Sequence, residues 1–169
     1  MRFQPLSLLA AILLATANVA LAEEYSSGPL TIEHPWARPT PPNATFGVGY
    51  MSITNAGQED VSLVGAKTPR AARVSIHQSR MHMEMMGMEP MPDGLAIPAG
   101  ETVELKPNGY HLMLENISGS LEEGERIPLT LAFDGAPDVE VELDVRPLDG
   151  QADNRESSDH DGMDHGAHQ

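Results

Sequence analysis

The sequence predicts an all-β protein, either an antiparallel sandwich or a Greek-key barrel, and three observations indicate this class. After the first 22 residues, no stretch shows the long apolar period of about 3.6 residues that an amphipathic helix would have. Short apolar runs recur instead, with Gly, Pro, Asn and Asp between them. In residues 139–145, apolar and acidic residues alternate, which indicates a strand with one buried and one solvated face.

Taken in order, a series of segments has the length and the apolar pattern of strands. These segments are residues 30–34, 47–54, 61–66, 72–77, 94–97, 102–105, 110–115, 126–133 and 139–145. Turn-forming residues separate many of them, for example in residues 55–57, 92–94, 107–109 and 134–135. Many short strands with regular turns favour a sandwich or a barrel.

Both ends of the chain differ from this pattern. Residues 1–22 are interpreted as a signal peptide, because Arg2 is the only charge, residues 6–14 are nearly all apolar and residues 20–22 form a small-x-small cleavage pattern. The apolar run is too short to span a bilayer comfortably. We therefore expect export to the periplasm, cleavage, and no membrane insertion afterwards. A β-barrel domain is expected over residues 23–147 and a polar, acidic, disordered tail over residues 148–169.

The overall charge and the absence of cysteine restrict the function. A formal net charge of −15 has the wrong sign for binding nucleic acid or an anionic membrane surface. With no cysteine, the chain has neither disulfides nor a thiolate metal site. A blue-copper electron-transfer centre needs a cysteine thiolate, so that class of protein is excluded.

The most informative segment is residues 81–91, which read MHMEMMGMEPM and hold six methionines and one histidine. Thioether sulfur and imidazole nitrogen are ligands that suit a soft ion, above all Cu(I). A core strand would use Val and Ile, and a core helix would not carry Gly87 and Pro90. Because exposed apolar side chains invite association, the cluster predicts a copper-binding role rather than a neutral surface.

Further donors flank this segment. His111 and Met113 lie two residues apart on one predicted strand, so they project from the same face. If residues 81–91 fold as a hairpin or loop over the end of the barrel, His77 and Met88 converge on that face. Two imidazoles and two thioethers would then surround one Cu(I) ion. Taken singly, Met113 is also compatible with core packing and His111 with a hydrogen-bonded surface histidine.

The order His77, ten residues, Met88, about twenty residues and then His-x-Met resembles the motif of the periplasmic PCu(A)C copper chaperones. The resemblance extends over roughly residues 30–146 and includes residues 35–38, 41–42, 50–55, 97–100 and 105–113. The spacer between Met88 and His111 holds 22 residues, one more than is usual for the family. Met86 and Met85 are therefore alternatives to Met88.

This resemblance implies a cupredoxin-like β-barrel that binds one Cu(I) through His77, Met88, His111 and Met113. It implies a metallochaperone. We also expect a monomer, and we expect no enzyme activity because the sequence shows neither a Ser-His-Asp ordering nor a paired-carboxylate pocket. The acceptor would be the binuclear copper centre of cytochrome c oxidase, reached directly or through a Sco-type protein.

Three alternatives stay open at this point. The additional methionines could pass copper inward by successive ligand exchange, or they could form an apolar rim for docking a partner. The tail has imidazoles among carboxylates and could bind Cu(II) through His160, Met163, His165 and His168. The same ligands could also serve a copper storage or resistance protein that acts as a sink.

Overall fold

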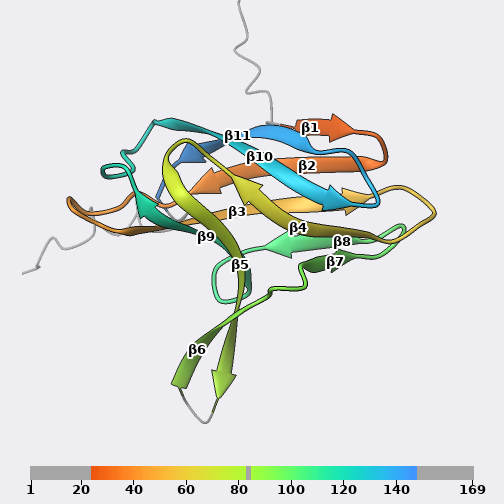
Figure 1. The fold of residues 1–169 in the computed structure, drawn as a ribbon, viewed down its shortest axis with the longest axis horizontal. Coiled ribbons are helices and arrows are strands. Elements are labelled where there is room, and N and C mark those ends of the chain that lie inside the picture. The colour runs from red at the N-terminus through yellow and green to blue at the C-terminus, as the bar shows by residue number, and fades with distance from the viewer. Residues whose placement is uncertain (1–23, 83–84, 148–169) are drawn as a thin grey trace, which may run out of the picture.

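The computed structural model describes residues 24–82 and 85–147, and every regular element in these ranges is a β-strand (Figure 1). The strands are β1 (Glu24–Ser27), β2 (Leu30–Ala37), β3 (Phe46–Asn55), β4 (Val61–Lys67), β5 (Ala71–His82), β6 (Met85–Pro90), β7 (Leu95–Ile97), β8 (Thr102–Leu105), β9 (Tyr110–Ile117), β10 (Arg126–Asp134) and β11 (Val139–Val145). The predicted all-β class is confirmed. None of the described elements is a helix long and apolar enough to cross a membrane.

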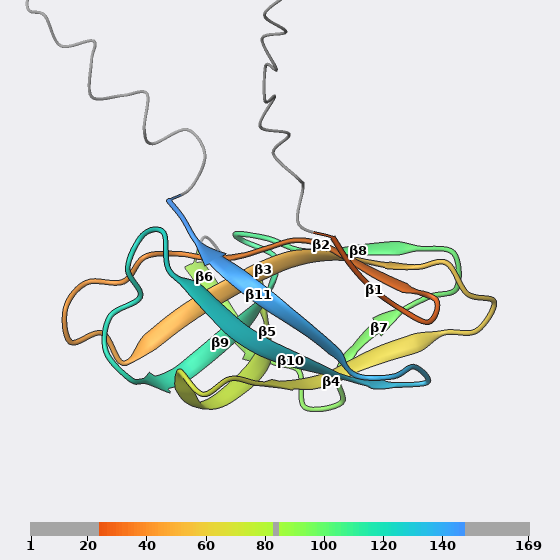
Figure 2. The same cartoon turned by 90° about the horizontal axis from the view of Figure 1, so that it is seen from above.

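The strands form one continuous sheet that closes on itself as a barrel. The neighbours around the barrel are β5, β9, β8, β3, β2, β11, β10 and β4. The pairing of Ala66 with Val74 joins β4 to β5 and so completes the ring. Outside this ring, β1 pairs with β2, β7 with β4 and β6 with β5. Figure 2 shows β10 and β11 running side by side and obliquely across one side of the barrel.

Pairing within the ring is mainly antiparallel, as predicted, but β8 and β9 are parallel neighbours, and so are β2 and β11. Their register places Asp144 opposite Trp36 and Val145 opposite Ala37. Parallel strands need a long crossover connection, and here almost the whole described chain lies between the two partners. Local alternation carries no information on such a distant pairing, so the sequence pattern did not predict it.

Alternating side chains fill the barrel. The apolar residues of β11 are buried, whereas Glu140 and Glu142 between them are exposed, as the pattern predicted. Ile76 on β5, and Leu112 and Leu114 on β9, belong to the same continuous core. Burial of this apolar surface is the main favourable contribution to folding. It also fixes which residues of β5 and β9 face outward, and these carry the candidate site.

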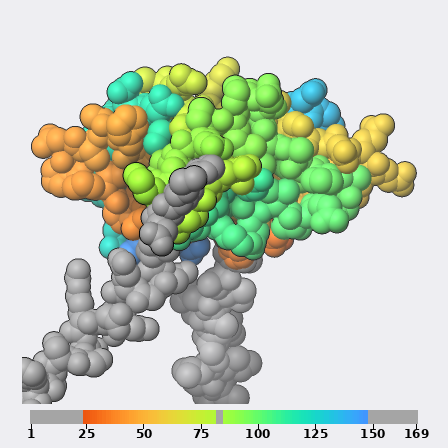
Figure 3. Space-filling view, turned by 90° about the horizontal axis from the view of Figure 1, so that it is seen from below, coloured from red at the N-terminus to blue at the C-terminus, as the bar shows by residue number. Residues whose placement is uncertain are grey.

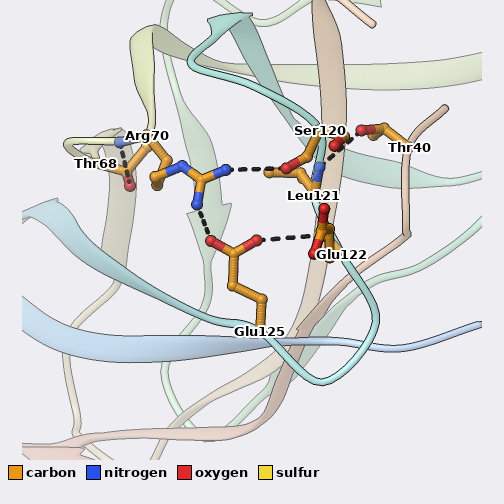
Figure 4. Close-up of polar contacts among 7 residues, drawn as sticks. All are labelled: Thr40, Thr68, Arg70, Ser120, Leu121, Glu122 and Glu125. Carbon is orange, nitrogen blue, oxygen red and sulfur yellow. Dashed lines mark hydrogen bonds and ion pairs between the residues drawn. The ribbon is translucent and has the colours of Figure 1, made fainter. Parts of the chain in front are cut away.

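A polar network around Arg70 ties three segments together near one end of the barrel. The Arg70 guanidinium forms an ion pair with Glu125 and donates a hydrogen bond to the Ser120 carbonyl oxygen at 3.0 Å (Figure 4). The hydroxyl of Thr40 accepts a hydrogen bond of 2.9 Å from the backbone N–H of Leu121. The segment after β2, the turn before β5 and the segment before β10 are thereby linked.

The methionine-rich segment forms the end of β5 and all of β6, which together project from the barrel as a hairpin (Figure 1). β6 was not among the predicted strands, and neither was β1. Every β6 residue except the half-buried Gly87 is exposed, so neither a buried face nor an alternating pattern marks it as a strand. The expected signal peptide and tail lie outside the described residues, and both stay predictions.

Candidate metal centre

His77 on β5 and His111 on β9 lie directly opposite each other in the antiparallel register. Their sequence neighbours Ile76 and Leu112 are buried in the core, so the two histidines project from the outer face of the barrel. The ring centroids are 5.8 Å apart and the ring planes are inclined by 32°. His111 is 3% exposed and His77 is half-buried. The structure therefore brings together the two imidazoles that the sequence singled out.

Hydrogen bonds define which nitrogen of His77 carries the proton. The hydroxyl of Ser75 donates to the Glu115 carboxylate at 2.6 Å and lies 3.0 Å from Nε2 of His77. Because the single hydroxyl proton goes to the carboxylate, the Ser75 oxygen accepts from the Nε2–H of His77. Nδ1 of His77 is then left with a free lone pair. This chain of carboxylate, hydroxyl and imidazole is an arrangement that orients metal-binding histidines.

The proton of His111 is placed in a similar way. Its Nδ1 lies 3.2 Å from the carbonyl oxygen of Gly109, which can only accept, so Nδ1–H is the donor and Nε2 keeps a lone pair. The same carbonyl accepts from the backbone N–H of Ser79 at 3.0 Å, which ties the end of this loop to β5.

Two buried side-chain nitrogens have no hydrogen-bond partner among the described residues, and they are Nδ1 of His77 and Nε2 of His111. Buried polar atoms normally have a partner, so each such exception needs an explanation. Here the orphaned atoms are the two lone pairs left by the hydrogen bonds above, and they sit on adjacent rings. A shared metal ion would satisfy both atoms at once.

The surroundings of His77 favour its neutral form by lowering its pKa. Burial lowers the pKa of His77 below its ordinary value of 6.5, and the neighbouring His111 and Arg73 lower it further, while Glu115 acts in the opposite direction. Only the neutral imidazole can bind a metal ion, so a lowered pKa reduces competition from protons.

Met113 provides the first thioether on this face. It lies two residues after His111 on β9, opposite Ser75 of β5, and is half-buried. Side chains two apart on a strand share a face, so Met113 projects beside His111. The sequence predicted this pairing of imidazole and thioether from the His-x-Met spacing.

Met88 lies on the other side of the histidine pair. It pairs with Ser79 of β5, two residues beyond His77, and therefore occupies the same outer face. Its side chain is 60% exposed, so no packing holds the thioether away from the imidazoles. Diagonal cross-strand neighbours lie about 7–8 Å apart, which a long side chain can bridge.

The two predicted alternatives to Met88 lie on different faces of the hairpin. Met86 pairs with Met81 and shares the face of Met88, one register step farther from the histidines. Met85 pairs with His82 in the register and therefore lies on the opposite face.

The donors gathered here are imidazoles and thioethers. Within residues 24–82 and 85–147, no group of three or more His, Cys, Asp and Glu residues is arranged to hold a metal ion. Mg²⁺ and Ca²⁺ prefer several oxygen ligands, whereas imidazole and thioether together suit a soft ion such as Cu(I). The predicted tail ligands His160, Met163, His165 and His168 lie outside the described residues.

Sequence reasoning missed the residues that orient the imidazoles, namely Ser75, Glu115 and the Gly109 carbonyl. A signal for Ser75 was present, because a hydroxyl two residues before His77 on a strand shares its face. The role of Glu115 depends on the register between β5 and β9, which no local pattern shows.

Residues 30–145 match the family model described as "Putative lipoprotein LpqE-like". A curated relative from Leifsonia xyli subsp. xyli, "Putative lipoprotein Lxx21020", is 31% identical over 111 residues, which cover 66% of this chain. The match spans 64% of that relative's length, so less than two thirds of the relative is represented here.

Solved structures of similar proteins have the same fold. The copper-bound PCuAC domain from PmoF2 is 27% identical with a TM-score of 0.62, over 74% of this chain and 98% of that domain. The solution structure of CuI-DR1885 from Deinococcus radiodurans is 28% identical with a TM-score of 0.57, over 79% of this chain and 86% of that one. The predicted cupredoxin-like Greek-key barrel is confirmed. From the extent of the family match and the shared barrel, the chain belongs to the LpqE-like family, which is the family of PCuAC domains.

Proposed function

We propose that this protein is a copper chaperone that binds one Cu(I) ion through His77, His111, Met113 and Met88. The observation that carries this proposal is the pair of orphaned lone pairs on His77 Nδ1 and His111 Nε2. Each belongs to an imidazole whose other nitrogen is hydrogen-bonded, so both rings are oriented in advance for a shared ligand. Met113 and Met88 lie on the same face and can complete the site.

The PCuAC family supports copper as the cargo. The PmoF2 domain is described as copper-bound and the DR1885 structure as its Cu(I) form. The donor set agrees with Cu(I), because the chain has no cysteine and, within residues 24–82 and 85–147, no group of three or more His, Cys, Asp and Glu residues could hold a metal ion instead. Four protein ligands would leave no open position for a substrate or oxygen, which favours a carrier over an enzyme.

Release follows from the nature of the ligands. All four are neutral when copper is bound, so an incoming thiolate of an acceptor is a stronger donor than the thioether it displaces. The exposed Met88 is the ligand that we expect to leave first, since packing does not retain it. Displacement needs no change in the oxidation state of copper.

We infer that the acceptor is another extracytoplasmic copper protein. The family resemblance favours the binuclear copper centre of cytochrome c oxidase, reached directly or through a Sco-type protein. The lipoprotein names of the relatives agree with export, and we propose the periplasm as the compartment. In that setting the His-rich tail would be an additional Cu(II) site outside the barrel.

The test is an anaerobic Cu(I) titration against a chromophoric chelator, performed on residues 23–169 and on residues 23–147. We expect one tight equivalent in both forms. His111→Ala and Met113→Leu should each weaken it by about tenfold or more, since every 1.4 kcal/mol or so of lost ligation is a factor of ten. Tight binding that disappears with the tail would contradict the barrel site.

A transfer experiment separates a chaperone from a storage protein. The loaded protein is mixed with a copper-free acceptor domain that carries a thiolate site, and the two are separated and assayed for copper. A chaperone gives up its ion to the acceptor. A storage or resistance protein would load several ions and yield none.

A further inference from the structure

The β5–β6 hairpin has two chemically different faces. One carries Met81, Met86 and Met88, which the register places on the same side as His77. The other face carries Arg80 and Glu89, which form an ion pair with the Nε of Arg80 3.6 Å from a carboxylate oxygen of Glu89. Three methionines of the hairpin therefore share the face that leads to the histidine pair, whereas Met85 lies on the other face.

The methionines on this face form a ladder. Met81 pairs directly with Met86, and Met88 follows at the next register step, opposite Ser79. One further step reaches His77, and each step of two residues is about 6.6 Å along the strand. Successive thioethers are thus close enough for flexible side chains to hold one ion in turn.

These thioethers are open to solvent. Met81 is 66%, Met86 is 51% and Met88 is 60% exposed, so none of them serves as core packing. In the space-filling view from below, the yellow-green surface of this part of the chain lies in the middle of the face toward the viewer (Figure 3). Exposed sulfur at the projecting end of the hairpin is where an ion from solution would first meet a soft donor.

We propose that Met81 and Met86 form a second, weaker Cu(I) site at which the ion first binds, and that Met88 passes it from there to His77 and His111. This inference rests on the proposed copper function of the barrel site. Two exposed neutral thioethers hold Cu(I) less tightly than two oriented imidazoles with two thioethers, so transfer toward the barrel is downhill.

The transfer is a sequence of ligand exchanges. A Cu–S bond to Met88 forms before one to Met86 or Met81 breaks, and a bond to an imidazole lone pair follows. Copper stays Cu(I) throughout, so no oxidant or reductant is required. Thioethers carry no proton to lose, and the imidazole nitrogens involved are already free of protons in the neutral rings.

The experiment compares rates of Cu(I) loading, because a relay of this kind, from Met81 and Met86 through Met88 to the histidines, changes the rate of uptake and not the final affinity. The double variant Met81→Leu with Met86→Leu keeps the apolar volume but removes both sulfurs. Met85→Leu is the matched control, because Met85 belongs to the same hairpin, is 74% exposed and lies on the opposite face. Cu(I) is supplied anaerobically as its complex with a chromophoric chelator, and its disappearance is followed by stopped-flow absorbance.

We expect the double variant to load Cu(I) about tenfold more slowly, because it lacks the first site that holds the ion beside the barrel. This factor is smaller than the largest enhancement that linking two binding sites can give. The control should load at the wild-type rate, and the affinity of the tight equivalent should be unchanged in both. In the wild-type protein with excess Cu(I), the methyl NMR signals of Met81 and Met86 should shift while that of Met85 does not. This second measurement needs no variant and does not depend on how a variant folds.

Three outcomes would overturn the relay. Equal loading rates in all three proteins would show that the ion reaches the barrel without Met81 and Met86. Loss of the tight equivalent in the double variant would make Met81 and Met86 ligands of the main site instead. Unchanged loading from the chelator, with slower transfer to an acceptor protein, would make this face a docking surface. Failure of the proposed copper function can be distinguished from failure of the relay, because the wild-type protein would then bind no tight equivalent of Cu(I).

Discussion

At the scale of single residues, the histidine pair is prepared for metal binding by groups that never touch the metal. Ser75 and Glu115 keep the proton of His77 on Nε2, and the Gly109 carbonyl keeps that of His111 on Nδ1. The lone pairs of the two rings are thereby fixed before any ion arrives. Orienting partners of this kind contribute to affinity because the bare ligand would otherwise sample both tautomers and several ring orientations.

Removing the orienting group should weaken copper binding without removing a ligand. For Ser75→Ala and for Glu115→Gln, we expect Cu(I) affinity to fall by about 10–100-fold, the usual effect of losing such a partner. Ser79→Ala is the control, since Ser79 lies on the same face of β5. Chelator competition measures all three. Equal affinities for Ser75→Ala and Ser79→Ala would refute this role for Ser75.

The lowered pKa of His77 has a consequence for the stability of the apo protein. In the unfolded chain His77 has an ordinary pKa near 6.5, and in the folded protein its pKa is lower. As pH falls below about 6.5, the unfolded state takes up the proton first, so the folded state loses stability. Above that pH both states are neutral at His77 and this contribution is constant.

The measurement is an NMR titration of His77 together with free energies of unfolding between about pH 7.5 and pH 5.5. We expect a folded-state pKa below 6.5 and a smaller loss of stability over this range in His77→Gln than in the wild type. A His77 pKa above 6.5 would contradict the assignment.

At the scale of elements, the end of β3 depends on one buried side chain. Asn55 is 0% exposed, and its amide donates to the carbonyl oxygens of Glu59 at 2.8 Å and Ile97 at 3.0 Å. Its side-chain oxygen accepts from the backbone N–H of Gly57 at 3.0 Å. One amide therefore holds the turn after β3 against the end of β7.

Asn55→Ala should destabilise the protein by about 2–3 kcal/mol, because buried backbone groups lose their partners. Gln58→Ala, an exposed change in the same turn, should cost less than about 0.5 kcal/mol. Urea unfolding of both apo proteins gives the comparison, and similar midpoints would show that Asn55 is dispensable.

Strands with one buried face could be predicted from sequence, and strands without one could not. β11 has clear alternation because the core selects every second residue. β6 has no buried residue, and β1 has one apolar side chain, Tyr25, packed against the core, so neither sequence shows an alternating apolar pattern. The residues of the candidate site could likewise be predicted only in part. Spacing predicted that His111 and Met113 share a face, whereas the meeting of His77 with His111 depends on register between distant strands.

At the scale of the whole molecule, the core and the candidate site are separate. None of the four proposed ligands belongs to the continuous cluster of buried apolar residues. The fold therefore draws its stability from the barrel interior, in contrast to small metal domains that unfold without their ion.

Apo protein should consequently show a single cooperative thermal transition. Cu(I) should raise the midpoint, since a ligand at a hundred times its dissociation constant adds about 2.7 kcal/mol to the native state. Far-UV circular dichroism under anaerobic conditions, with and without Cu(I), checks both points. Cu(I) should raise the midpoint of His111→Ala less than that of the wild type, and an apo protein without a cooperative transition would overturn this view.

The exposure of the hairpin also determines how the protein would age in air. Met81, Met86 and Met88 are open to oxidants, whereas Met113 is half-buried. Oxidation to the sulfoxide replaces a soft sulfur donor by a polar group that binds Cu(I) poorly. Damage would thus begin at the outer thioethers and reach the barrel last. An aged sample would keep its fold, its imidazoles and the half-buried Met113, whereas oxidation of Met81 and Met86 would slow copper uptake and oxidation of the equally exposed Met88 would weaken the barrel site.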